Sequence, residues 1–267
     1  MNPVAVSRGQ SPLILGLPHS GTYVPPEIFN ALNARGQRLA DTDWHVDRLY
    51  DGIFPEATTV KANFNRYVID ANRSPDSESL YPGLNTTGLV PTTDFEGLPI
   101  WESEPLSDEI DARRTAWHAP YHAALAHEIH RVRELHGIAV LYDCHSIRSS
   151  APYLFQGRLP DFNIGTNSGL SCDVRIADAV EGVCHKAQGL TTVRDGRFRG
   201  GWTTRHYGCP DNGIHAIQME LAQSAYLSTE SEPFNYDIEK SNTLRGHLRS
   251  ILDAIIAEIT TLESKTL

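Results

Sequence analysis

The stretch Val140-Leu-Tyr-Asp-Cys-His-Ser146 (VLYDCHS) carries the two signals that indicate the fold class. Val140 to Tyr142 continue an apolar run that begins at Ile138, which is typical of a buried strand. An acid, a thiol, an imidazole and a hydroxyl follow at once. In open α/β sheets, ligands bind beyond the carboxyl ends of the strands. We therefore expect Asp143 and His145 to belong to a site at the edge of such a sheet.

Similar apolar runs recur along the chain and alternate with helical patterns. Further strands are expected at residues 12–17, 58–62, 67–70, 191–193 and 214–221. Helices are expected to begin at 25–26 and near Asp43, and to span 107–136, 172–188 and 236–263, with Ser107 as an N-cap and Gly137 as a terminator. This alternation predicts one α/β domain, residues 1–267, with a mostly parallel sheet and helices on both faces.

The composition argues against several classes of partner. The formal net charge of −10 disfavours nucleic acid and anionic membrane surfaces, although a few arginines in one pocket could still bind a small anion. The four cysteines form no CxxC pair and are expected to be reduced thiols of a cytosolic protein. No signal-peptide pattern and no apolar run of about 18 residues is apparent, so we expect a cytoplasmic protein without a membrane span.

Two histidines and an acidic stretch suggest a metal site. His19 and His145 each follow an apolar run, and although a hydrogen-bonded loop histidine is the simpler interpretation of either alone, the pair favours a metal centre. A catalytic zinc takes about three protein ligands. The third is expected from residues 41–47 (DTDWHVD), in which we predict that Asp43 points into the site and Asp41 caps a helix. Asp47 could join Asp43 on one helix face or pair with a neighbouring arginine.

Two further carboxylates are candidates for this site. Asp143 lies two residues before His145 and is expected on the same face, either as a ligand or as an acceptor that orients an imidazole. Glu220 ends the run 214–220 and is suited to activate a water molecule, whereas the alternative is a capping or paired glutamate. His215 and Gln218 are expected to face away from Glu220.

Basic residues suggest an anion-binding pocket. Asn72 and Arg73 form a candidate carboxylate clamp, and Arg66 could bind the same anion or form a structural ion pair. For each arginine, a solvated surface position is the alternative. The glycine-rich stretch 194–205 could offer backbone amides and arginines to a ligand. Residues 75–104 are rich in proline, glycine, serine and threonine, which is typical of a long functional loop such as a lid.

Six of these pieces, in order, resemble motifs of the N-formylglutamate amidohydrolases, also called N-formylglutamate deformylases. The matching pieces are Pro18-His-Ser-Gly21, Thr42-Asp-Trp-His-Val-Asp-Arg-Leu49, Arg66-Tyr-Val-Ile-Asp-Ala-Asn-Arg73, Asp143-Cys-His-Ser146, Arg197-Phe-Arg-Gly-Gly-Trp202 and Gln218-Met-Glu-Leu221. The resemblance implies a fold similar to that of zinc carboxypeptidases (phosphorylase/hydrolase-like), with a central mixed sheet between helices. It also implies metal-dependent hydrolysis of N-formyl-L-glutamate to formate and L-glutamate, the last step of a histidine degradation route.

By this resemblance His19, Asp43 and His145 would be the metal ligands, Glu220 the general base, and Asn72 and Arg73 the residues that bind a substrate carboxylate. Arg205 is a further substrate-binding candidate, and either Arg66 or Arg205 is expected to stabilise the developing oxyanion. One divalent metal is implied, with zinc expected ahead of manganese or cobalt. The family usually has glycine at the position of His45, so the role of this histidine stays open. The 75–104 loop would close over the substrate, with Asp76, Glu78 and Asp94 turned outward.

Three alternatives differ in substrate or class. Residues 43–47 also match the D-x-H-x-D motif of arginase-like ureohydrolases, one of which acts on formiminoglutamate, but the second motif of that group, D-x-D-x-x-D, is missing. A deacylase of another N-acyl amino acid, such as an N-acylaspartate or a longer acyl glutamate, would need only a reshaped pocket. The third alternative is a catalytically silent protein that binds a metal or an acidic ligand. Such a protein could have lost any of His19, Asp43, His145 and Glu220, so the presence of all four argues against it. We expect a small acidic substrate and a monomer or small homo-oligomer.

Overall fold

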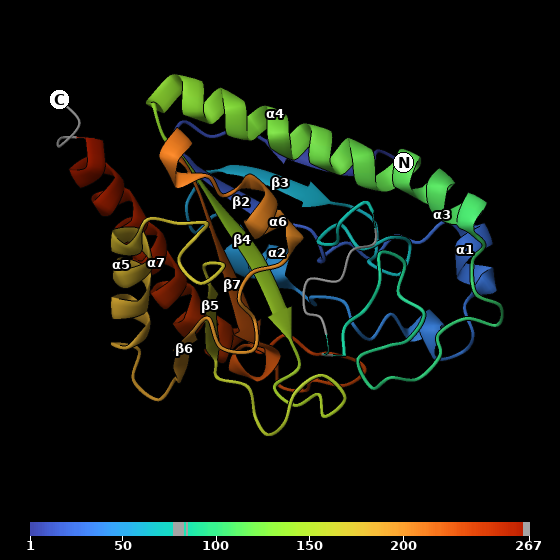
Figure 1. Cartoon of the computed structure of the whole chain (residues 1–267). Coiled ribbons are helices and arrows are strands. Elements are labelled where there is room, and N and C mark those ends of the chain that lie inside the picture. The colour runs from blue at the N-terminus through green and yellow to red at the C-terminus, as the bar shows by residue number, and fades with distance from the viewer. Residues whose placement is uncertain (77–82, 84, 264–267) are drawn as a thin grey trace.

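The computed structural model describes residues 1–76, 83 and 85–263, and a seven-stranded sheet forms the centre of this part of the chain (Figure 1). The strand order is β1-β3-β2-β4-β7-β5-β6. The strands are β1 Val4–Ser7, β2 Leu13–Leu17, β3 Thr58–Ala62, β4 Ala139–Ile147, β5 Phe162–Gly165, β6 Thr192–Arg194 and β7 Ile214–Ala222. β3, β2, β4 and β7 are parallel neighbours, whereas β1 pairs antiparallel with β3 and β5 with β7. The predicted mixed, mostly parallel sheet is confirmed.

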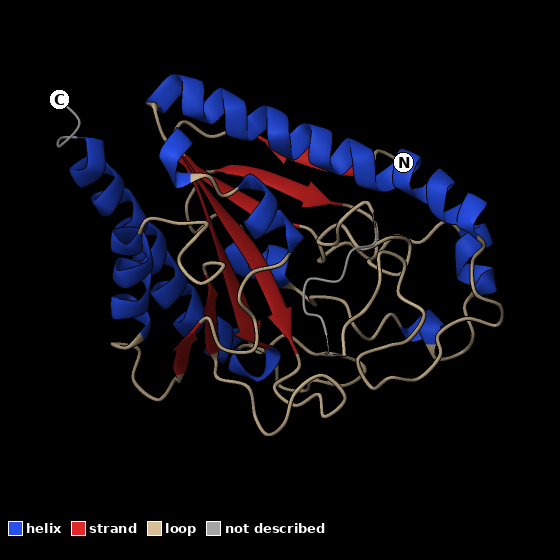
Figure 2. Ribbon diagram, in the orientation of Figure 1, coloured by secondary structure: helices blue, strands red, loops and turns tan. Residues whose placement is uncertain are grey.

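Helices cover both faces of this sheet (Figure 2). They are α1 Pro26–Ala31, α2 Val46–Tyr50, α3 Ser107–Arg113, α4 Ala119–His136, α5 Val174–Cys184, α6 Trp202–Tyr207 and α7 Ile238–Glu263. α1, α4 and α6 lie on one face, and α2, α5 and α7 on the other. Within the described ranges, no helix has both the length and the apolar composition needed to cross a membrane.

The central strand β4 is buried on both faces and is longer than predicted. Val140 and Tyr142 face the layer of α2, α5 and α7, whereas Leu141 faces the layer of α4, which explains the continuous apolar run. The strand does not end at Tyr142, because all nine of its residues pair with β7. His145 lies opposite Glu220 in this register. The polar residues therefore stand on the sheet itself rather than in a loop after it.

Residues 67–70 do not form the predicted strand. They lie in turns after β3, where the Val68 amide donates to the Asn65 carbonyl (2.9 Å) and the Asp70 amide to the Leu89 carbonyl (2.7 Å). The apolar pattern has another cause, since Val68 and Ile69 are buried in the layer under α4. Strands β1 and β5 and helix α6 were not predicted because they are short and their sequences have little periodicity.

The predicted helix 107–136 is continuous in space but is not a uniform α-helix. A π-helical turn, Arg114–His118, separates α3 from α4. The N-cap is Leu106 rather than Ser107, and the Glu109 side chain accepts a hydrogen bond from the Leu106 amide (2.7 Å). Gly137 ends α4 with a φ of 73°, as predicted.

Candidate active site

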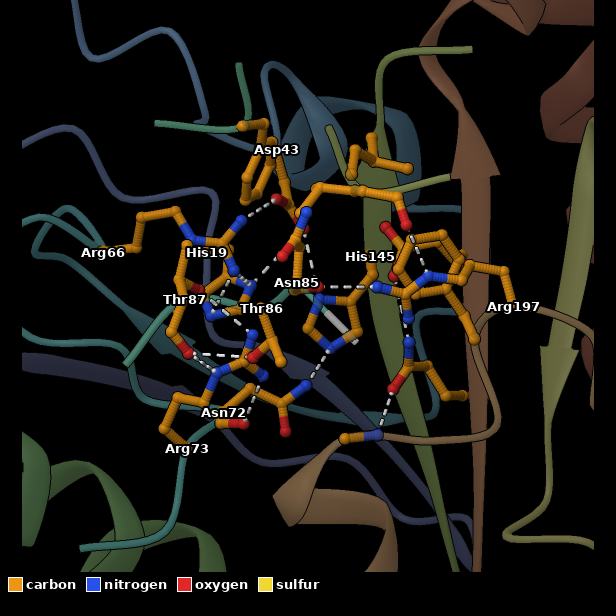
Figure 3. Close-up of a pocket in the computed structure, with 17 residues that line it drawn as sticks. His19, Asp43, Arg66, Asn72, Arg73, Asn85, Thr86, Thr87, His145 and Arg197 are labelled. Carbon is orange, nitrogen blue, oxygen red and sulfur yellow. Dashed lines mark hydrogen bonds and ion pairs between the residues drawn. The ribbon is translucent and has the colours of Figure 1, made fainter. Parts of the chain in front are cut away.

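The candidate site is a pocket at the carboxyl ends of β2, β4 and β7 (Figure 3). His19 follows β2, whereas His145 on β4 and Glu220 on β7 are paired neighbours on adjacent strands. Asp43 comes from the turn before α2, and its amide donates to the His19 carbonyl (3.1 Å). Sheet pairing and this loop contact therefore bring four predicted residues into one pocket.

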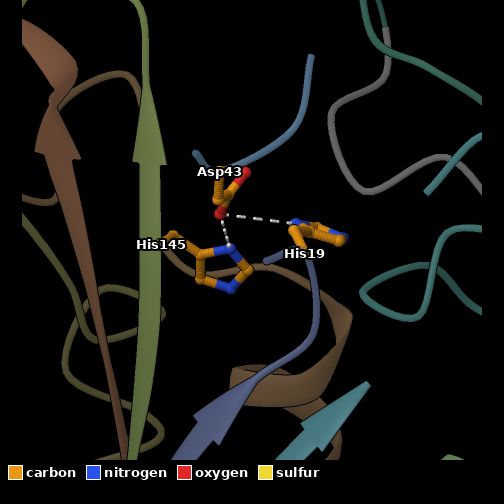
Figure 4. Close-up of side chains that lie close together, drawn as sticks. All are labelled: His19, Asp43 and His145. Carbon is orange, nitrogen blue, oxygen red and sulfur yellow. Dashed lines mark hydrogen bonds and ion pairs between the residues drawn. The ribbon is translucent and has the colours of Figure 1, made fainter. Parts of the chain in front are cut away.

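His19, Asp43 and His145 form a buried cluster whose ligand atoms lie within 4.8 Å of one another (Figure 4). Asp43 Oδ2 lies 3.2 Å from His145 Nδ1 and 3.8 Å from His19 Nδ1. Asp43 Oδ1 has no hydrogen-bond partner among the described residues. That oxygen has only a longer ion-pair contact with Arg66 Nη1 (3.6 Å), and two imidazoles with such a carboxylate suit a divalent cation such as zinc. The predicted ligand set thus fits a metal centre.

A second buried carboxylate contacts the far nitrogen of each imidazole. Asp70 Oδ1 lies 2.7 Å from His19 Nε2, and Asp143 Oδ2 lies 3.0 Å from His145 Nε2. Such carboxylates orient metal-binding histidines and fix their tautomers. Asp143 lies beside His145, and neither of its oxygens accepts a hydrogen bond from the described residues. Asp70 was given no role from the sequence; the only signal was its place in the polar cluster 70–74.

Burial and charge set the protonation of the cluster. Burial, together with the Arg66 charge, lowers the pKa of His19. Burial acts in the same direction on His145, but the Asp143 and Asp43 carboxylates outweigh it and raise the pKa of His145 well above its usual value. Burial would raise the pKa of Asp43, yet its bond to His145 and the charges of His19 and Arg66 lower it. Asp43 is therefore held as a carboxylate.

Arg66 is a buried cation beside the cluster. Its Nη2 lies 3.1 Å from Asp70 Oδ2 and 2.9 Å from His19 Nδ1, and its Nη1 donates to the Asp41 carbonyl (3.1 Å). Asp41 does not cap α2, which begins five residues later; its carboxylate instead accepts a hydrogen bond from the Tyr67 hydroxyl (2.8 Å). Arg66 forms the predicted structural ion pair and also lines the pocket.

Asn72 and Arg73 both line the pocket, as the clamp hypothesis requires. Asn72 Nδ2 lies 3.0 Å from His145 Nε2, while the Thr203 amide donates to Asn72 Oδ1 (2.9 Å). Arg73 Nε donates to the Thr87 carbonyl (2.8 Å). Asn72 therefore contacts a candidate metal ligand, and Arg73 stands farther out.

Glu220 and Gln218 act as a pair on β7. The prediction that Gln218 faces away from Glu220 is wrong, because residues two apart in a strand share a face. Its Nε2 donates to Glu220 Oε2 (3.0 Å), and its Oε1 accepts from the Gly201 amide (2.7 Å). Burial raises the pKa of Glu220 to about 7, although the charges of His145 and Arg66 oppose the shift.

The glycine-rich stretch supplies a different arginine from the predicted one. Arg197 lines the pocket, whereas Arg205 is not among the described residues that do so. Arg205 Nε donates to the Gly200 carbonyl (2.9 Å) behind the pocket wall. Arg197 donates to the carbonyls of Leu154 (2.9 Å) and Asn85 (3.0 Å). The glycine-rich stretch therefore lines the pocket through Arg197, Phe198 and Gly201 rather than through Arg205.

His45 and Asp47 point away from the cluster. His45 Nε2 donates to the Phe234 carbonyl (3.0 Å), and Lys61 Nζ donates to Asp47 Oδ2 (3.1 Å). The Arg48 guanidinium does not pair with Asp47 but lies over the Tyr236 ring, 3.9 Å from its centroid. Neither His45 nor Asp47 is therefore placed to share an ion with Asp43.

The predicted 75–104 loop forms one wall of the pocket through Asn85, Thr86, Thr87 and Phe95. Residues 77–82 and 84 lie outside the described residues, so the expectation for Glu78 falls there. Asp94 is not turned outward: it is buried and accepts hydrogen bonds from the amides of Glu96 (2.9 Å) and Leu98 (3.1 Å).

Fold and site together define a class, the mixed-sheet α/β proteins that carry a candidate metal centre at the carboxyl edge of the sheet. Residues 11–227 match the family model of N-formylglutamate amidohydrolase, and the chain belongs to this family.

Relatives and a solved structure agree with this assignment. The chain is 43% identical over 259 residues to an N-formylglutamate deformylase of Pseudomonas aeruginosa, covering 95% of this chain and 96% of the relative. It is 44% identical over 255 residues to an N-formylglutamate deformylase of Pseudomonas putida, covering 94% of each. The crystal structure of an N-formylglutamate amidohydrolase from Ralstonia eutropha has the same fold, with a TM-score of 0.81 at 23% identity over 95% of this chain and 97% of that one.

Proposed function

We propose that the chain is a single metal-dependent amidohydrolase domain that hydrolyses N-formyl-L-glutamate to formate and L-glutamate, as the last step of a histidine degradation route. The observation that carries this proposal is the buried cluster of His19, Asp43 and His145 beside Glu220. The names of the relatives supply the substrate.

The cation would be held by His19, Asp43 and His145, with Asp70 and Asp143 orienting the two imidazoles. Zinc is the proposed ion, with manganese or cobalt as substitutes, because two imidazoles and one carboxylate resemble the donor sets of catalytic zinc. When bound, it supplies Lewis-acid activation of the formyl carbonyl and of the attacking water.

Glu220 is the proposed general base. Its pKa of about 7 lets the carboxylate accept a proton from the attacking water near neutral pH and return it to the leaving amine nitrogen. Gln218 holds one of its oxygens (3.0 Å) and leaves the other available on the pocket side. Protonation of the nitrogen by Glu220 prevents the expulsion of a strongly basic anion.

The arginines of the pocket bind the negative charges of the substrate. Arg66 is closest to the cluster and stabilises the oxyanion that develops at the formyl carbon. Arg73, with Asn72, binds a carboxylate of the glutamate moiety. Arg197 takes the substrate-binding role predicted for Arg205, because Arg197 lines the pocket.

The alternatives receive less support. A ureohydrolase would require His45 and Asp47 near the ion, but these residues bond to Phe234 and Lys61. Deacylation of another N-acyl amino acid would use the same residues, so only a substrate series separates it from the proposed reaction.

The test is formate release from purified protein with N-formyl-L-glutamate, compared with N-formyl-L-aspartate and acetate release from N-acetyl-L-glutamate. We expect the highest kcat/KM for N-formyl-L-glutamate. A preference for N-acetyl-L-glutamate or an aspartate substrate would replace the proposed substrate, and no hydrolysis of any of the three would refute the function.

A further inference from the structure

Residues 107–136, in which α3, the π-helical turn and α4 follow one another, form one continuous rod (the α3–α4 rod). One face of this rod donates hydrogen bonds to the segment that carries Asn72 and Arg73. His118 Nε2 lies 3.0 Å from the Arg73 carbonyl oxygen, and His122 Nε2 lies 2.8 Å from the Ala71 carbonyl oxygen. Both imidazoles are buried. The two acceptors are thus the carbonyls of the residues just before and just after Asn72.

The π-helical turn explains how the rod reaches this segment in register. Arg113, five residues before His118, donates from Nη1 to the Val68 carbonyl (3.3 Å). In an uninterrupted α-helix, residues five apart point in clearly different directions, whereas a π turn brings them onto one stripe. Arg113, His118 and His122 therefore contact one segment.

The segment needs such donors because it has no strand neighbour along residues 71–73. The Arg73 amide turns back to the Asp70 carbonyl (3.2 Å), and the Asn72 amide donates to Asp70 Oδ1 (2.8 Å). These local bonds shape the turn but do not fix its position relative to the sheet. The bonds from the rod contribute to this position, together with the contact of Asp70 with His19 (2.7 Å). From the other side, the Trp202 amide donates to the Asn72 carbonyl (3.4 Å) and the Thr203 amide to Asn72 Oδ1 (2.9 Å).

A carbonyl oxygen only accepts hydrogen bonds, so each Nε2 must carry the proton. Burial lowers the pKa values of both His118 and His122, which keeps the rings neutral near pH 7. His122 Nδ1 lies 3.0 Å from the Tyr207 hydroxyl on α6, the helix that also carries Thr203. The His122 ring therefore contacts the Ala71 carbonyl through Nε2 and α6 through Nδ1.

We propose that His118 and His122 are positioning residues of the active site, which hold the Ala71–Arg73 backbone so that Asn72 contacts His145 and Arg73 faces the substrate. This inference rests on the proposed function for the roles of Asn72 and Arg73. Because His118 holds the carbonyl of Arg73, it acts mainly on substrate binding. Because His122 holds the residue between Asp70 and Asn72, it acts mainly on the cluster and hence on turnover.

The experiment compares His118→Leu and His122→Leu with the conservative variants His118→Gln and His122→Gln. The amide nitrogen of glutamine lies near the place of Nε2 and can still donate. We expect kcat/KM for N-formyl-L-glutamate to fall about 10–100-fold in each leucine variant, and each glutamine variant to recover about tenfold of the loss. The fall should appear mainly in KM for His118→Leu and mainly in kcat for His122→Leu.

Two controls on the same helix separate positioning from stability. His130→Gln changes an exposed histidine and is expected to leave activity and melting temperature unchanged. Val132→Ala opens a cavity in the buried face and is expected to lower the melting temperature while KM and kcat stay within about twofold. Nitrogen NMR of the wild type should find both rings neutral with the proton on Nε2.

Leucine variants with wild-type KM and kcat, or an Nδ1 proton on both rings, would overturn the inference. So would leucine variants whose KM and kcat change no more than those of a Val132→Ala protein of equal melting temperature. The NMR result does not depend on the substrate, so a wild type that hydrolyses nothing but has both Nε2 protons would refute the proposed function and leave the backbone contacts standing.

Discussion

The two halves of the pocket are fixed by different means. His145, Asp143 and Glu220 stand on β4 and β7, where nine consecutive backbone pairs set their register. The half formed by residues 65–104 has no such ladder. Asp70 is held there by side-chain contacts with His19 and Arg66, and Asn72 by side-chain contacts with His145 and the Thr203 amide. Sites on strands are positioned more firmly than sites on loops. The loop half should therefore respond more strongly to substitutions that remove one hydrogen bond.

The largest effect is expected for Glu220, the proposed general base on the sheet half. Glu220→Gln keeps the shape and the neighbour Gln218 but removes the proton acceptor, so kcat should fall about 10²–10⁴-fold. The melting temperature should not fall, because the substitution removes a buried charge. Steady-state kinetics and thermal melting check this. Retained kcat would exclude Glu220 as the base.

The next effect compares the two orienting carboxylates directly. Asp143→Asn on the sheet and Asp70→Asn in the loop should each weaken zinc binding about 10–100-fold, measured by competition with a chelator. Asp70→Asn should also lower the melting temperature more, because Asp70 is paired with the buried Arg66 (3.1 Å). Equal melting temperatures would contradict the proposed difference between the halves.

A smaller effect is expected at Gly201, which lies between Asn72 of the loop half and Gln218 of the sheet half. A Cβ on Gly201 would lie 2.2 Å from Asn72 Nδ2, so Gly201→Ala must displace Asn72 or the backbone. We expect a loss of about 1–3 kcal/mol in unfolding free energy, with reduced kcat/KM. Gly182→Ala in α5, where a Cβ meets nothing within 4 Å, is the control and should be neutral or stabilising. Similar results for both variants would mean that Asn72 is not held tightly.

A further effect, which appears only on acidification, is a pH dependence of stability in the layer behind the loop half. Burial, with His118 and His206 nearby, lowers the pKa of His122 to about 3. Between pH 3 and the unfolded value of about 6.5, the unfolded chain binds a proton that the folded chain does not. This contribution is complete above that unfolded value and is lost as the pH falls, by about 1.4 kcal/mol per unit.

The measurement is the unfolding free energy of the wild type and of His122→Gln from pH 7 to 4. The variant lacks the titrating ring, so the difference between the two proteins should shrink as the pH falls. A constant difference would contradict a buried, neutral His122.

The contrast between the halves also explains what the sequence could predict. The period of two along a strand places Asp143 beside His145, and the same rule, applied to β7, would have put Gln218 beside Glu220. No period relates His19 to Asp70, which lie 51 residues apart and meet only because the turns after β3 return to the site.

The directions of the side chains in the glycine-rich stretch 194–205 could not be predicted from the sequence either. Arg197 precedes Gly200, which has a φ of 105°, whereas Arg205 lies on helix α6, and of the two only Arg197 lines the pocket. The composition indicates a ligand-binding stretch, but the backbone path that directs each side chain cannot be read from it.

The most direct test of the central claim measures bound zinc and formate release on the same samples of the wild type and of His145→Ala. We expect a single zinc ion per wild-type chain, activity that is lost on chelation and returns in proportion to added zinc, and neither zinc nor activity in His145→Ala. Full formate release by metal-free wild type, or undiminished zinc binding by His145→Ala, would contradict it.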